Sequence, residues 1–182
     1  MRNAAFAATA FATTMAAASL ALSPVAQAQT AVEPAMLLNE QSGDYTAEVV
    51  RDGQGGCNLN LYSGPTNVNA LTFVDPASGP AMLIMVVPDT VAFQEPSDNV
   101  TFTVGHGADR ASGATDVIVQ PPQGDGTRLL ALIVPSHMKR TLIENDITAT
   151  NASGETALSH QVPAALRTKA LASFDGCVSD RG

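Results

Sequence analysis

The sequence predicts a mainly β fold: a single-domain β-sandwich or barrel-like fold with a short helix near 137–144 and a C-terminal helix near 163–175. Two observations favour this class. Short segments with alternating apolar and polar residues recur along the chain, and turns rich in Gly, Pro and Asp separate them. Helical spacing of apolar residues occurs at only two places, so strands must supply most of the core.

The first 28 residues are typical of a cleavable signal peptide. Arg2 precedes an Ala-rich apolar stretch over 4–22, and the Ala-Gln-Ala tripeptide at 26–28 is a pattern that signal peptidase recognises. The alternative is an uncleaved membrane anchor, since the apolar stretch approaches the roughly 18–20 residues that a span needs. The abundance of Ala and Thr in place of Leu and Ile favours the signal peptide, with cleavage after Ala28.

The expected mature chain is therefore exported, to the periplasm or the medium. No later segment is long and apolar enough to span a bilayer, so we expect no stable membrane insertion after cleavage. Residues 29–43 are predicted to form a flexible N-terminal arm. Residues 44–182 have the length of one ordinary domain and are predicted to form a single β-rich domain.

The first predicted elements form a hairpin. Apolar and polar residues alternate over 45–50 and again over 57–62, and the return strand begins at Cys57. The turn at 52–56 is rich in glycine. A phosphate-binding loop is the alternative for these glycines, but neither the Gly-Lys-Ser/Thr sequence nor a helix follows, so a hairpin turn is favoured.

Further strands are predicted along the middle of the chain. The segment 81–87 is apolar at every position, which indicates a central strand or one covered on both faces. Two of the strands flank a polar loop at 121–126 and are predicted to form a second hairpin. The predicted strands are 71–74, 81–87, 99–104, 116–120, 128–134 and 147–150.

Two helices are predicted from apolar spacing. Met138 and Leu142 lie four residues apart before the strand at 147–150. Pro163 suits a first helical turn, and the residues that follow at intervals of four share one face. Gly176 is expected to end this helix. The residues of the shared face are Leu166, Ala170 and Phe174.

Cys57 and Cys177 are the only cysteines. An even number of cysteines in an exported chain predicts a disulfide. The alternatives are a redox pair or two metal ligands. A redox pair usually occurs as Cys-x-x-Cys, and two isolated thiols make only half of a zinc site. The disulfide would fasten the C-terminal helix to the strand that begins at Cys57.

Charge and composition argue against nucleic acid as a partner. The formal net charge is −8, and it becomes −9 once cleavage removes Arg2. Between residues 29 and 109 the only basic residue is Arg51. Such an acidic surface repels nucleic acid and anionic lipid; it can attract a cationic partner, although solubility alone explains it. The chain has no Trp and few other aromatic residues for stacking on bases or sugars.

Two groups of polar residues are candidates for ligand contact. His106 and Asp109 lie in a predicted polar loop after a strand, where they could act as a general base or metal ligand, or form only a solvated turn. His137, Lys139 and Arg140 lie at a predicted helix start, where an anion could bind; helix capping and a solvated basic face are the simpler explanation.

No residue is assigned a catalytic, cofactor-binding or metal-binding role. The chain has neither a Gly-x-Ser-x-Gly nor a His-Glu-x-x-His sequence, so serine hydrolase and zinc protease have no local support. His160 is expected to be an exposed strand residue. We therefore expect no cofactor.

The order of these features resembles the small alphaproteobacterial envelope proteins of the invasion-associated locus B family. The shared features are the Ala-rich signal peptide, a cysteine at the start of an early strand, the strand–helix–strand pattern over 131–151, and a terminal helix with a cysteine over 162–177. The resemblance implies a periplasmic β-rich protein with an envelope or host-contact role. It assigns no functional residue.

These observations lead to a functional hypothesis and two alternatives. The hypothesis is a non-catalytic periplasmic or secreted binding protein, associated with the envelope, whose partner is an unknown protein or envelope component. The first alternative is a hydrolase whose site combines residues distant in the sequence; a deep pocket joining His106 or His137 to a carboxylate would favour it. The second is an inhibitor of a secreted hydrolase, acting through the loop at 120–127.

Overall fold

The computed structural model describes residues 33–64, 70–135 and 138–181. All of them belong to the second of two compact units, which spans Ala31–Gly182. The predicted signal peptide and its cleavage site lie outside the described residues. In the part of the chain that the structure describes, no helix is long and apolar enough to cross a membrane.

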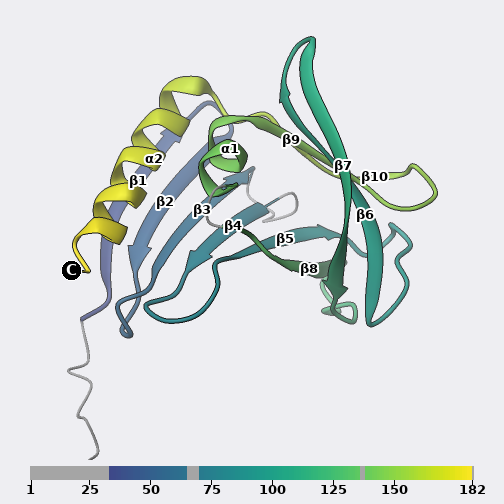
Figure 1. The fold of residues 1–182 in the computed structure, drawn as a ribbon, viewed down its shortest axis with the longest axis horizontal. Helices are drawn as coiled ribbons and strands as arrows, with labels where there is room; N and C mark the ends of the chain where they lie inside the picture. Colours follow the sequence, from purple (N-terminus) through teal and green to yellow (C-terminus); the bar gives the residue numbers. More distant parts are fainter. Residues whose placement is uncertain (1–32, 65–69, 136–137, 182) are drawn as a thin grey trace, which may run out of the picture. The chain divides into compact units, whose positions relative to one another are not determined.

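One antiparallel sheet of ten strands dominates the described residues, which confirms the mainly β fold (Figure 1). The order of neighbours in the sheet is β1-β2-β3-β4-β5-β8-β7-β6-β9-β10. The sheet is open, with β1 and β10 at its ends, and it curls far enough for β10 to contact β5. The strands are β1 (Ala35–Ser42), β2 (Tyr45–Arg51), β3 (Cys57–Ser63), β4 (Ala70–Asp75), β5 (Met82–Pro88), β6 (Ser97–His106), β7 (Asp109–Val119), β8 (Thr127–Ile133), β9 (Asp146–Thr150) and β10 (Thr156–His160).

The described residues also form two helices that pack on each other, α1 (Lys139–Glu144) and α2 (Ala164–Ser179). The long helix α2 packs on β1, β2 and β3 (Figure 1). Its buried face contributes Leu166, Ala170 and Phe174 to the core, as the spacing predicted. Alternate residues of the strands complete the core, because each strand turns every second side chain inward.

The disulfide between Cys57 and Cys177 is present, with the two Cα atoms 6.1 Å apart. Both cysteines are buried. Cys57 begins β3, and Cys177 lies on the buried face of α2. The bond therefore fastens the last helix to the sheet, as predicted from the cysteine count.

Residues 35–42 correct the prediction of a flexible arm over 29–43. They form the edge strand β1, which pairs with β2 from Ala35↔Arg51 to Ser42↔Tyr45. Gly43, with a φ of 61°, supplies the left-handed backbone that the tight turn into β2 needs. The apolar alternation over β1 is weak, because its half-buried positions include Glu40 and Ser42 while Met36 and Leu37 are exposed. β1 therefore forms because its backbone pairs with that of β2.

Three further expectations were wrong in detail. The helix α2 continues past Gly176 to Ser179, because the buried face includes Cys177. The residues 105–110 are not a flexible loop: β6 runs to His106 and β7 starts at Asp109. His160 is buried, and its ring lies edge-on against Tyr45 at 5.6 Å between ring centroids.

Candidate functional site

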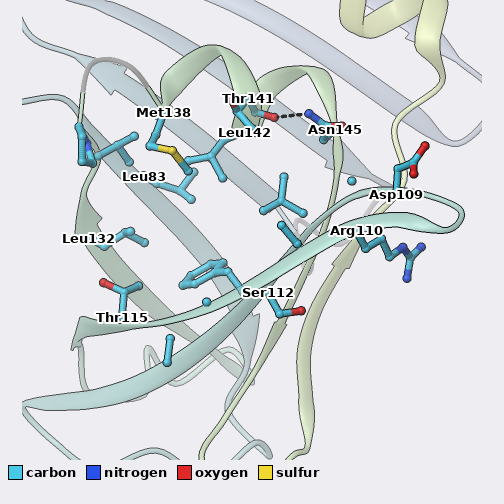
Figure 2. A pocket seen from close by; sticks show the side chains of 18 of the residues that line it. Leu83, Asp109, Arg110, Ser112, Thr115, Leu132, Met138, Thr141, Leu142 and Asn145 are labelled. Atoms are coloured by element: carbon cyan, nitrogen blue, oxygen red, sulfur yellow. Dashed lines mark hydrogen bonds between the residues drawn. The ribbon is translucent and has the colours of Figure 1, made fainter.

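A hollow opens where β7 separates from β8. β7 pairs with β6 along its length, from His106↔Asp109 to Ser97↔Ile118. With β8 it pairs only at Ile118↔Ala131 and Val119↔Leu130. From that point the two strands diverge, and a cavity of about 910 Å³ lies between them (Figure 2).

Apolar side chains from several elements form the wall of this cavity. β5 contributes Leu83 and β6 contributes Phe102, while Leu132 follows from β8. Met138 and Leu142 lie on the side of α1 and point toward the same space (Figure 2). These residues are far apart in sequence, and the order of strands in the sheet brings them together.

The cavity exists because β7 presents small residues toward it. Ala111 pairs with Val104 and Gly113 pairs with Phe102, so these four residues share one face of the β6–β7 hairpin. A Cβ atom built on Gly113 would meet no atom within 4 Å. Small residues on β7 thus leave the space that larger ones would fill.

The charged residues that line the cavity lie at one end of it. Asp109 and Arg110 begin β7 there, with Asn145 nearby at the end of α1 (Figure 2). The Asn145 side-chain amide donates a hydrogen bond of 2.7 Å to the Thr141 carbonyl oxygen, which fixes the last turn of α1. The site therefore combines an apolar body with a polar end, as small-molecule and peptide sites often do.

His106 belongs to a second, smaller hollow of about 430 Å³. Its Nε2 lies 3.2 Å from the Glu144 carbonyl oxygen, and its Nδ1 lies 3.3 Å from Oδ2 of Asp146. Nη1 of Arg167 donates a hydrogen bond of 2.8 Å to the other oxygen of Asp146. Arg140 lines the same hollow and forms an ion pair with Glu144, at 2.8 Å. The sequence did not suggest that Asp146 would be the partner of His106.

The remaining candidate residues are separated from one another. Asp109 lies at the rim of the large cavity, across the hairpin turn from His106. Lys139 forms an ion pair with Asp75, which also accepts a hydrogen bond of 2.9 Å from Arg181. His137 lies outside the described residues. The four candidates that the structure describes therefore do not form one site.

The Asp75 cluster has the character of a structural ion pair. Burial alone would raise the pKa of Asp75, but hydrogen bonds from Lys139 and Arg181 and the charges of both outweigh it. The pKa of Asp75 is consequently lower than its ordinary value of 3.8. All three side chains are largely buried. Asp75 ends β4, so the cluster ties this strand to α1 and to the end of the chain.

The hollow around His106 offers limited chemistry. Thr168 supplies the one side-chain hydroxyl among its described lining residues, and it donates a hydrogen bond of 3.0 Å to the Ala164 carbonyl oxygen within α2. Within 33–64, 70–135 and 138–181 there is no group of three His, Cys, Asp or Glu side chains placed to hold a metal ion. The arrangement supports ion pairing more directly than nucleophilic attack.

The apolar cavity was missed from the sequence. Its β7 wall, Asp-Arg-Ala-Ser-Gly-Ala-Thr over 109–115, has no apolar alternation, and no strand was predicted there. One feature of the sequence could have indicated the cavity: residues 109–115 have no large apolar side chain, although the neighbouring strand β6 alternates strongly.

The fold and cavity define a disulfide-closed antiparallel β domain with an apolar pocket in a divided sheet. No protein-family model, no curated protein and no solved structure matches the chain significantly.

Proposed function

We propose that this protein is a non-catalytic binding protein of the periplasm or the secreted fraction, and that the cavity between β7 and β8 is its binding site. The observation that carries the proposal is the size and lining of the cavity. Its volume of about 910 Å³ lies in the range of about 300–1,000 Å³ that is usual for ligand sites. The occupant is an apolar group, because most of the wall is aliphatic or aromatic.

Exposed apolar surface beside the cavity supports this proposal. Ile133 lines the cavity and is 64 % exposed, and Ile118 on β7 is 54 % exposed. Large apolar side chains gathered at a pocket often mark an interaction surface. An envelope role, as the resemblance to invasion-associated locus B proteins implies, is compatible with binding and requires no catalytic group.

A hydrolase is the second candidate, and the contact between His106 and Asp146 favours it. A carboxylate beside a half-exposed His is one part of a general base. The hydroxyl of Thr168 already donates to the helix backbone, which is why we rank this candidate below binding. An inhibitor acting through the exposed residues 120–126 rests on exposure alone.

Binding of a neutral apolar dye tests the cavity. We expect N-phenyl-1-naphthylamine to bind wild-type protein with increased fluorescence, and Gly113→Leu to weaken that binding about tenfold or more, equivalent to about 1.4 kcal/mol, because the new side chain enters the cavity. The matched control is Gln120→Leu, since the exposed Gln120 directly after β7 does not line the cavity. Equal loss of dye binding in both variants, or none in Gly113→Leu, would contradict the proposal.

Export has its own test. We propose that the protein crosses the inner membrane and is cleaved after Ala28, so the mature chain should begin at Gln29. Mass spectrometry of the intact protein from periplasm and medium measures this end directly. A chain that keeps Met1 and stays with the membrane fraction would contradict it.

A further inference from the structure

The edge of β7 that faces the cavity carries backbone groups with no strand beside them. Val119 N–H donates to the Pro96 carbonyl oxygen on the β6 side, and Gln120 N–H donates to the Leu129 carbonyl oxygen on the β8 side. Successive N–H groups of an antiparallel strand point to opposite edges. The N–H groups of Arg110, Ser112 and Ala114 therefore point away from β6, toward the side where β8 has diverged.

This edge differs from the two outer edges of the sheet. The pairing of β1 with β2 shifts register between Met36 and Leu38, and that of β10 with β9 shifts between Thr156 and Leu158. Such bulges discourage an edge from pairing with another chain. The pairing of β6 with β7 runs without a shift, and β7 has no Pro or Lys along it. β7 is thus a long, regular edge that lacks a bulge, Pro and Lys, and its charged residues are Asp109, Arg110 and Asp116.

We propose that this edge binds an extended segment of a partner polypeptide as an additional strand. The proposal rests on the function proposed above and names the class of partner. Main-chain hydrogen bonds to β7 would supply affinity, and every second side chain of the incoming strand would enter the apolar cavity. The segment would continue the β7–β8 ladder beyond Ile118↔Ala131, in the space that β8 leaves.

The charge of the β6–β7 hairpin indicates which charge the bound segment would have. The β6–β7 hairpin contains Asp98, Asp109 and Asp116 against Arg110 alone. The whole chain has a formal net charge of −8. A neutral or basic segment is therefore favoured over an acidic one. We infer a strand in which apolar residues alternate with polar or basic residues.

The test uses a phage-displayed library of random decapeptides, selected on the mature protein. We expect enriched peptides with alternating apolar residues, and we expect Ser112→Pro to weaken their binding at least about tenfold, because Pro removes an outward N–H. The matched control is Thr103→Val on β6, outside the proposed binding edge. It loses the 2.7 Å contact between the Thr103 and Ser112 hydroxyls but leaves every N–H of β7 in place, so it should bind as wild type.

Hydrogen exchange supplies a second readout that does not depend on the variant. Bound peptide should slow exchange at the amides of Arg110, Ser112 and Ala114, while the intervening amides, already paired with β6, change little. The naphthylamine dye separates the two proposals: dye binding with no enriched peptide would overturn the strand and leave the cavity function intact. Peptide binding that survives Ser112→Pro, or an edge occupied by a second copy in sedimentation, would also overturn it.

Discussion

Reduction of the disulfide between Cys57 and Cys177 is expected to lower the free energy of unfolding by about 2–5 kcal/mol. The two residues are 120 positions apart, so the bond constrains most of the unfolded chain. It also holds α2 against β3, where Phe174 and Leu166 are buried. Folded domains are stable by only about 5–15 kcal/mol, so much of the stability depends on this bond.

Chemical denaturation with and without reductant measures the effect. Replacing both cysteines by Ala should lower stability by a similar amount, and adding reductant to that variant should change nothing further. Thiol labelling of denatured, untreated protein gives an independent readout. Two reactive thiols in protein taken from its native compartment would contradict a structural disulfide.

The substitution Asp75→Asn is expected to cost about 3 kcal/mol, at the lower end of the range for removing one partner of a buried ion pair. It leaves the largely buried Lys139 and Arg181 without their carboxylate. The matched control is Asp180→Asn, which breaks a 3.3 Å ion pair between Arg51 and the exposed Asp180. Exposed pairs contribute about 0–1 kcal/mol, so this control should remain close to wild type.

The effect of Asp75→Asn should depend on pH in one direction. The pKa of Asp75 is lower in the folded protein than its ordinary value of 3.8. The charged carboxylate therefore adds stability that is fully present above 3.8 and is lost as the pH falls through the lower folded pKa. Urea denaturation of both proteins at neutral pH and at steps below 3.8 measures the difference. A difference that stays constant into strong acid would contradict the assignment.

Local pattern was sufficient for the elements with a strong apolar pattern. The hairpin at 45–62 and the face of α2 agree with the structure because their apolar residues recur at a period of two or about four. The strand at 81–87 agrees because it is apolar at every position. The disulfide also followed from the sequence, since two cysteines in a chain predicted to be exported leave one intramolecular pairing. The export signal itself stays a prediction.

The sequence was a weaker guide to strands that depend on backbone pairing. β1 and the first half of β7 have little apolar alternation, because β1 lies at an edge and residues 109–114 are exposed on both faces. Their hydrogen bonds to β2 and β6 are non-local, and no pattern within seven or eight residues encodes them.

The sequence by itself determined the class of fold, the covalent closure and the acidic character of this protein. The position of the cavity could be determined only from the tertiary structure. The cavity requires that β8 pair with β5 along its length and leave β7 after two pairs, and that Gly113 lie opposite Phe102. These pairings depend on how the ten strands of the described sheet pack around one core, because each strand takes the position in which the sheet as a whole packs best.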